Sequence, residues 1–322
     1  MSRRMLLAAV ATTAAGLLAV AAPAQAQYPA KPVRVVVTTV PGPLDTFARV
    51  ITDKMSGALK QPFVIENKPG AGGNIGADVV AKSAPDGYTL LFALDTTFTV
   101  NPSIYKTMPF DVAKDFAVIS VPVTYGQMLA VNASVPAKSL AELVQLAKQK
   151  PLNYASGGNG SPSHLSYAYF LAASGIDMRH IPYKGTGQSI VDVVAGQVDS
   201  IFAVTTGVYP HVKSGRLRAL AVSSLKRSEV APEVPTVAES GFQGFDASFA
   251  YVLLAPARTP EDIVQVLARE VKNAMAAPDV KEKNRLADYS PTGLDARQSA
   301  AWLADKRAHW AGVVQRAGIM AE

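Results

Sequence analysis

The stretch NYASGGNGSPSHLSYAYF, residues 153–170, combines small and polar residues in an order that could bind an anion. Residues 157–161 carry almost no side chain, so this segment leaves its backbone N–H groups accessible. Ser161 followed by Pro162 is typical of a helix N-cap and first helical residue. Because a helix N-terminus attracts negative charge, the stretch predicts either an anion site or an ordinary strand-to-helix connection.

Two further strand-to-helix turns, at residues 41–46 and 70–75, also contain small residues and N-cap candidates. In open α/β sheets, ligands bind beyond the carboxyl ends of the strands, so three such turns favour a small-molecule cleft. The segment GAGGNIG at 70–76 has Ile75 where the dinucleotide fingerprint needs its third glycine. That fingerprint is therefore excluded, and this loop by itself indicates a tight turn before a helix.

The sequence gives little support for catalysis or metal binding. Ser161 and Ser163 lie near His164, but GNGSP is not the G-x-S-x-G nucleophile elbow, and no acid partner is indicated. The four histidines lie 16, 31 and 98 residues apart, and the chain has no cysteine, which fits no metal motif. His164 is typical of a cap or surface residue, and Asp45 of an N-cap. We expect no catalytic residue, no metal and no cofactor.

Residues 1–26 are expected to be a cleaved secretory signal peptide. Arg3 and Arg4 precede an uncharged Ala/Leu/Val stretch, and 24–26 form a small-x-small cleavage site. A retained membrane anchor is the alternative, and either general secretory or twin-arginine export would fit. A chain without cysteine forms no disulfide in the periplasm, so its stability must come from a core, for which 49% hydrophobic residues suffice. The basic residues are scattered, so no nucleic-acid partner is expected.

Short apolar runs alternate with helical patterns, which is typical of an α/β fold. Helices are expected after each of the first two turns and at 139–148, 162–174, 189–195, 260–276 and 296–317. Strands are expected at 33–40, 63–67, 89–94, 115–123, 128–132, 153–156, 179–183, 198–204, 217–224 and 248–256. No polar linker marks a single boundary, which indicates two lobes and two crossings between them. We assign 27–127 plus 247–322 to lobe 1 and 128–246 to lobe 2.

Six segments resemble the extracytoplasmic solute receptors of tripartite tricarboxylate transporters, the Bug family: KPGAGGNIGADVVAKSAPDGYTLL, NPSIYKTMPFDVAKDFAVIS, NYASGGNGSPSHL, IPYKG, GRLRALAVSS and VPTVAESG. The resemblance runs from about Tyr28 to Glu322. It implies a two-lobed periplasmic binding protein, type II-like, whose interlobe cleft holds a small carboxylate. The implied partners are the membrane permease subunits or a sensor kinase, and we expect a monomer. A secreted enzyme acting on small carboxylates is the alternative class.

The resemblance also implies which residues bind the ligand. In this family, a turn after the first strand and the GNGSPSH loop clasp one carboxylate, partly through water. Hydrogen bonds to a charged group contribute about 1.5–3 kcal/mol each, so four or five could support micromolar binding without a formal cation. Transferred by position, the ligand-binding residues are Pro41, Gly42, Pro43, Asp45, Asp95, Thr96, Thr97, Gly158, Asn159, Ser161, His164, Tyr183, Lys184, Ala203, Thr205 and Ala250.

Three positions depart from the family pattern. Ala203 stands where the family usually has aspartate, Ala250 where tryptophan is common, and Pro41 where the first of two glycines is usual. Two alanines at the expected border of the cleft predict a wider, more apolar site, while Asp45 and Asp95 would add negative charge. We therefore expect a bulkier monocarboxylate or an aromatic carboxylate rather than a short diacid or citrate.

Overall fold

Two β-sheets organise residues 28–320, the part of the chain that the computed structural model describes. The predicted signal peptide, residues 1–26, lies outside these described residues. The chain from Lys31 on belongs to one compact unit, which contains both sheets. Within residues 28–320, no helix is long and apolar enough to cross a membrane.

The first sheet has six strands in the order β11-β4-β10-β3-β1-β2. β1 pairs in parallel with β2 and β3, while β10 runs antiparallel between β3 and β4. The strands are β1 (Val33–Val37), β2 (Phe63–Asn67), β3 (Thr89–Leu94), β4 (Phe116–Tyr125), β10 (Phe249–Pro256) and β11 (Ser290–Pro291). The parallel part of the sheet brings the carboxyl ends of β1 and β3 to one edge, where the turns after them meet.

The second sheet has five strands in the order β7-β6-β8-β5-β9. β6 is parallel to β7 and β8, and β5 is antiparallel to β8 and β9. The strands are β5 (Gln127–Asn132), β6 (Asn153–Ser156), β7 (Arg179–Pro182), β8 (Ser200–Val204) and β9 (Leu217–Val222). The carboxyl end of β6 therefore carries the glycine loop that begins at Gly157.

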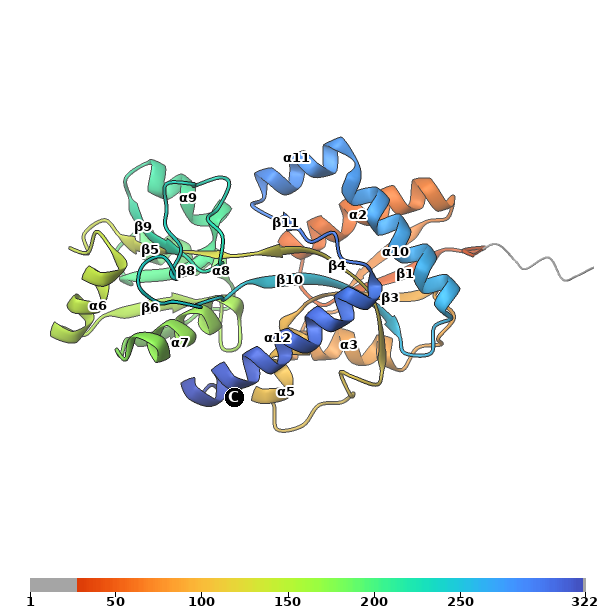
Figure 1. The fold of residues 1–322 in the computed structure, drawn as a ribbon, viewed down its shortest axis with the longest axis horizontal. Coiled ribbons are helices and arrows are strands. Elements are labelled where there is room, and N and C mark those ends of the chain that lie inside the picture. Colours follow the sequence, from red (N-terminus) through yellow and green to blue (C-terminus); the bar gives the residue numbers. More distant parts are fainter. Residues whose placement is uncertain (1–27, 321–322) are drawn as a thin grey trace, which may run out of the picture. The chain divides into compact units, whose positions relative to one another are not determined.

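The chain passes from the first sheet to the second between β4 and β5, and it returns ahead of β10. Figure 1 shows β4 and β10, which are paired antiparallel, running between the two sheets. The C-terminal helix α12 (Ala296–Ala317) packs against β4 and also contacts α7 (Pro162–Ser174) beside the second sheet. The residue numbers that we assign to the lobe boundaries stay a prediction.

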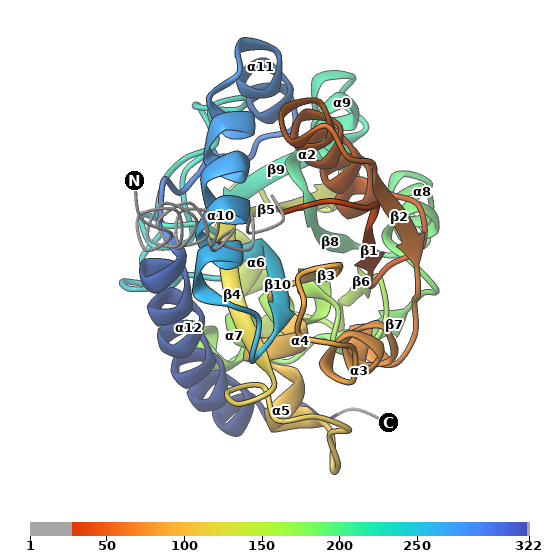
Figure 2. The same cartoon turned by 90° about the vertical axis from the view of Figure 1, so that its right-hand side faces the viewer.

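Helices cover both sheets, as Figure 2 shows from the side of the first sheet. On the first sheet, α2 and α10 lie together and α3 packs against β1 and β3. The remaining helices are α2 (Pro43–Leu59), the 3₁₀ turn η1 (Ala71–Gly73), α3 (Asn74–Ala81), α4 (Thr96–Thr99), α5 (Asn101–Ile104), α6 (Leu140–Gln149), α8 (Thr186–Val194), α9 (Thr205–Lys213), α10 (Glu261–Ala276) and α11 (Pro278–Leu286).

The sequence missed four of these helices for physical reasons. α4 and α5 have only four residues each, too few to show a helical period. α9 contains Pro210, and α11 is highly polar and buries only Val280 and Asn284. β1 is shorter than predicted, because it ends at Val37 and the next three residues form a turn.

Each sheet has its own hydrophobic core. The first core includes Phe98, Phe116 and Ala250, and the second includes Ile201 and Ala203. Phe98, Phe110 and Phe116 pack edge to face or tilted within the first core, at ring-centroid distances of 5.1–6.3 Å. These two cores fix the sheets, and they leave the turns at the strand ends to build the site.

Candidate functional site

A cavity of about 680 Å³ lies between turns that come from the two sheets. On the side of the first sheet it is lined by 38–40, 69–73, 94, 96, 101 and 104–105, and on the side of the second by 157, 159–162 and 184. Apolar atoms form most of its surface, and glycine backbone, hydroxyl and amide groups supply the polar part. Such a surface suits a small polar ligand held by precisely placed hydrogen bonds.

The glycine loop after β6 leads into the predicted helix start, but the N–H groups of Gly157, Gly158, Gly160 and Ser161 are hydrogen-bonded within the chain rather than accessible as expected. Ser161 is the N-cap of α7, its hydroxyl accepts a hydrogen bond from the His164 N–H, and Pro162 is the first helical residue. Gly160 has φ of 71°, and a Cβ there would lie 3.1 Å from Cδ1 of Ile104 across the cavity. Glycine is needed here both for the backbone conformation and for the close approach of the two sides.

A second glycine loop, residues 70–73, lines the opposite wall, and the sequence suggested only a tight turn for it. Gly72 and Gly73 have φ of 62° and 94°. The Gly72 carbonyl accepts hydrogen bonds from Thr97 Oγ1 and Asn101 Nδ2, each at 3.0 Å. Thr97 and Asn101 therefore fix this loop against the cavity. The sequence feature that could have identified this loop as part of the site is that it is one of the three small-residue turns that follow a strand.

One buried polar group on the cavity wall has no hydrogen-bond partner within residues 28–320, and two other polar side chains line the wall beside it. The Thr38 side chain is only 3% exposed, yet its Oγ1 has no partner there. The Tyr105 hydroxyl also lines the cavity, and burial raises its pKa, which keeps it a hydrogen-bond donor. Lys184 is the one formally charged side chain among the described lining residues. A buried hydroxyl without a partner is costly, which points to a ligand that supplies one.

The turn after β1 is braced by Asp45 rather than capped by it. Gly42 is the N-cap of α2, and Asp45 lies in the first turn, where it accepts bonds from Arg49 and Asn67. The Arg49 hydrogen bond holds the pKa of Asp45 below its ordinary value. Asn67 also donates to the Thr39 carbonyl at 2.9 Å, which links this network to the cavity wall. The prediction that Asp45 is the N-cap is wrong.

Asp95 is fully buried beneath the cavity instead of adding charge to its surface. One carboxylate oxygen accepts the Ala250 N–H at 2.9 Å, and the other lies 3.5 Å from the Thr99 hydroxyl. Burial raises the pKa of Asp95 to about 7. Its neighbours Leu94 and Thr96 line the cavity, so Asp95 fixes the end of β3 that presents them.

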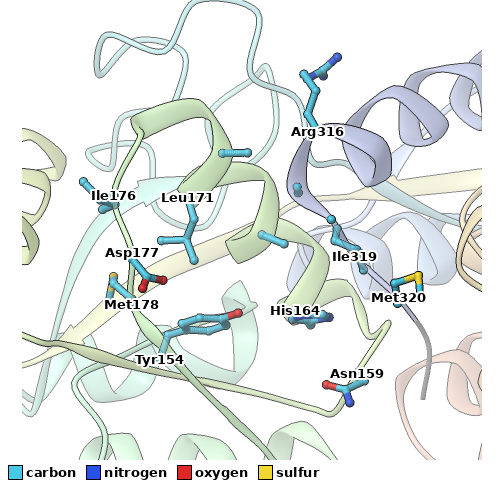
Figure 3. Close-up of a pocket in the computed structure, with 14 residues that line it drawn as sticks. Tyr154, Asn159, His164, Leu171, Ile176, Asp177, Met178, Arg316, Ile319 and Met320 are labelled. Carbon is cyan, nitrogen blue, oxygen red and sulfur yellow. The ribbon is translucent and has the colours of Figure 1, made fainter.

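His164 lies behind the glycine loop rather than on the surface. Its Nδ1 accepts the Gly160 N–H at 3.1 Å, and burial, with a smaller contribution from His180, lowers its pKa to about 4. The expected cap or surface role is therefore wrong, because the ring stays neutral and holds the loop backbone. Figure 3 shows His164 with Tyr154 at a second cavity of about 560 Å³, which the C-terminal segment closes with Ile319 and Met320.

The structure places four of the predicted site residues on the cavity wall: Thr96, Asn159, Ser161 and Lys184. The other predicted site residues lie outside this lining: Pro41, Gly42, Pro43, Asp45, Asp95, Thr97, Gly158, His164, Tyr183, Ala203, Thr205 and Ala250. Of these, the Tyr183 hydroxyl donates to Asp192 at 2.7 Å on α8, which turns it away from the loop. Lining residues that the sequence did not predict include Thr38, Thr39, Gly70, Asn101 and Tyr105.

The predicted widening of the cleft by two alanines is contradicted by their burial. Ala203 and Ala250 have no exposed surface and belong to the two hydrophobic cores. The space that a larger family residue would occupy at these positions is therefore filled by core side chains. Asp45 is paired with Arg49, and Asp95 is buried, so neither supplies the negative charge that we expected at the ligand.

Two α/β lobes joined by paired crossing strands, with a cavity between their strand-to-helix turns, define a periplasmic binding protein fold. Residues 47–319 match the model of the tripartite tricarboxylate transporter family receptor. The chain belongs to this family. It is 36% identical over 304 residues to Protein BugT of Bordetella pertussis, which covers 93% of each chain.

Solved structures have the same fold over nearly the whole chain. The structure "R. palustris Rpa4515 with adipate" has a TM-score of 0.83 and 32% identity, covering 91% of this chain and 99% of that one. MatC (Rpa3494) from Rhodopseudomonas palustris with bound malate has a TM-score of 0.78 and 31% identity, covering 89% of this chain and all of that one. The family assignment and the two-lobed fold predicted from the sequence are confirmed.

Proposed function

We propose that this protein captures a small carboxylate in the cavity between its two lobes and is a binding receptor rather than an enzyme. The observation that carries the proposal is Thr38, a residue of the cavity lining whose buried hydroxyl has no partner in the described chain. A carboxylate oxygen would satisfy this donor. The bound adipate and malate of the two relatives support the same ligand class.

The charge of the lining favours a dicarboxylate over a bulky monocarboxylate. One acid group would sit between the glycine loops, beside the N-terminus of α7, where the helix dipole stabilises negative charge. A second acid group would meet Lys184, for which the described residues offer no ion pair. Thr96, Asn159 and Ser161 remain the proposed contacts from the sequence prediction, and the other predicted residues act by holding these in place.

The family description names a transporter, so the proposed partners are the permease subunits of a tripartite tricarboxylate transporter rather than a sensor kinase. The receptor would be exported by its signal peptide, residues 1–26, and would work in the periplasm. We propose that the receptor is a monomer, as the sequence analysis expects. We propose the lobe boundaries of the sequence, near residues 127 and 247, as the hinge for closure on the ligand.

Thermal denaturation of the mature protein with a carboxylate panel tests this function. The panel contains adipate, malate, succinate, citrate, benzoate and phthalate. A ligand at 100 times its dissociation constant should stabilise the fold by about 2.7 kcal/mol. The panel should show stabilisation by a dicarboxylate and no chemical conversion of it after incubation. No stabilisation by any acid would overturn the ligand class, and turnover would overturn the receptor assignment.

A further inference from the structure

Four aromatic rings form a continuous stack behind the glycine loop. Tyr167 stacks on Tyr154 at 4.2 Å, Tyr154 on His180 at 4.8 Å, and His180 on His164 at 4.4 Å between ring centroids. The planes of the two imidazoles are nearly parallel, with an interplanar angle of 9°. Tyr154 of β6 therefore stacks on one face of the His180 ring, and His164 of α7 stacks on the other.

The His164 imidazole is hydrogen-bonded to the loop that lines the cavity, and the His180 imidazole is linked to this loop through Ser156. His164 Nδ1 accepts the Gly160 N–H at 3.1 Å. His180 Nε2 lies 2.6 Å from Ser156 Oγ, and this hydroxyl oxygen accepts the Gly158 N–H at 3.1 Å. Gly158 and Gly160 both have positive φ, 113° and 71°, so the loop backbone adopts a conformation that needs such support.

This arrangement needs an uncharged His164 imidazole. Nδ1 of His164 can accept the Gly160 N–H only while it carries no proton, so the neutral ring has its proton on Nε2. Two charged rings 4.4 Å apart would also repel each other. Titratable and charged groups on the elements packed around the pair include Tyr154, Tyr167, Tyr169, Asp177, Arg179, Lys184, Arg297, Asp305, Lys306, Arg307, His309 and Arg316.

We propose that His180 is a positioning residue of the binding site, which acts through Ser156 and His164 to hold residues 157–161 in the shape that lines the cavity. The inference rests on the proposed function, because it concerns the wall of the proposed carboxylate site. The hydrogen bonds and the ring stack belong to the chain itself, so His180 should hold the loop in the protein without ligand as well. His180 does not line the cavity, so its effect on binding must pass through the loop.

Three variants of the mature protein test the proposal: His180→Ala, Ser156→Ala and His211→Gln. His180→Ala removes both the stack and the hydrogen bond, while Ser156→Ala removes only the hydrogen bond and makes a smaller change to packing. His211→Gln is the control, because His211 lies on α9, where its Nδ1 is bonded to Arg216. Each variant is measured by amide hydrogen exchange of residues 157–161 and by an NMR titration of the His164 ring, both without ligand.

In His180→Ala, we expect exchange at Gly158 and Gly160 to become about tenfold faster at pH 7.5, the loss of roughly one hydrogen bond. Opening the space beside His164 and removing the neighbouring imidazole should raise the pKa of His164 toward its ordinary value. Ser156→Ala should expose mainly the Gly158 amide and leave the His164 titration unchanged. His211→Gln should match the unmodified protein in both measurements.

Adipate affinity, measured on the same variants at pH 8 and pH 5.5, separates this proposal from the proposed function. His180→Ala should weaken adipate binding about tenfold at pH 8 and more at pH 5.5, where its His164 becomes charged. If the unmodified protein does not bind adipate but His180→Ala still changes the amide exchange and the His164 titration, the positioning role stands and the ligand class is wrong. If His180→Ala keeps the loop protection, the His164 pKa and the adipate affinity of the unmodified protein, the positioning role is refuted.

Discussion

Replacing Asp95 with asparagine should remove a strong pH dependence from the stability of the fold. The carboxyl is fully buried, and its pKa rises from 3.8 to about 7 in the folded protein. A raised pKa means that the fold holds the proton more tightly than the unfolded chain does. The stabilisation from protonated Asp95 is therefore complete below pH 3.8, and it is lost as the pH rises through 7.

The size of the effect follows from the two pKa values. Linkage with folded and unfolded pKa values of about 7 and 3.8 makes the fold about 3 kcal/mol less stable at pH 8 than at pH 5 through this group alone. Asp95→Asn cannot ionise. Its amide oxygen can still accept the Ala250 N–H, and its NH₂ group would face the Thr99 hydroxyl.

Urea denaturation of the mature protein and of Asp95→Asn at pH 5, 6, 7 and 8 measures this contribution. The variant should gain about 3 kcal/mol relative to the unmodified protein between pH 5 and pH 8. The contribution of His164, whose lowered pKa makes the fold less stable as the pH falls from 6.5 toward 4, is common to both proteins and cancels. A difference between the two proteins that stays constant over the whole range would refute the assignment of a buried, proton-binding Asp95.

Three other substitutions have expected outcomes that urea denaturation can check. Ala250→Trp should destabilise the fold by about 1–3 kcal/mol or more, because Ala250 is fully buried in the first core and the indole would overpack it. Unchanged stability together with altered ligand binding would show instead that Ala250 borders the cleft. Gly160→Ala should cost about 1–2 kcal/mol, since its φ is 71° and the new Cβ would press on Ile104, and equal stability would contradict the interlobe contact. Lys306→Met should lower the free energy of unfolding by about 3–5 kcal/mol, because the mostly buried Asp246 carboxylate loses its ion-pair partner at 2.6 Å. Acidification below the ordinary pKa of aspartate should reduce this loss of stability. A loss that does not change with pH would indicate a packing effect instead.

Local patterns made most of the fold predictable. The Ser161–Pro162 start and the Gly175 end of α7 were readable because caps are encoded by neighbouring residues. The runs at Phe63–Asn67 and Thr89–Leu94 are β-strands with those same bounds, since each is short, apolar and ended by a turn. Elements without apolar periodicity, such as the polar helix α11, could not be found this way.

The site was less predictable, because it depends on which side chains the packing turns toward the cavity. Asp45 lies in the first turn of α2 and Asp95 directly follows β3, but pairing with Arg49 and complete burial remove their charges from the cavity wall. The family pattern predicts that Ala250 borders the cleft, whereas its side chain on β10 packs into the first core. The Thr38 hydroxyl gives no signal in the sequence, since its importance lies in being buried without a partner.

Calorimetric titration of adipate and malate into the mature protein, Thr38→Val and Thr52→Val tests the central claim most directly. Thr52 is the matched control, a buried threonine of α2 whose hydroxyl bonds to the helix backbone and which lies outside the cavity lining. We predict saturable binding of one dicarboxylate per chain, weakened at least tenfold by Thr38→Val and unchanged by Thr52→Val, since hydrogen bonds to a charged ligand are worth about 1.5–3 kcal/mol. Thr38→Val that binds as tightly as the unmodified protein would contradict the proposal that this cavity holds the carboxylate.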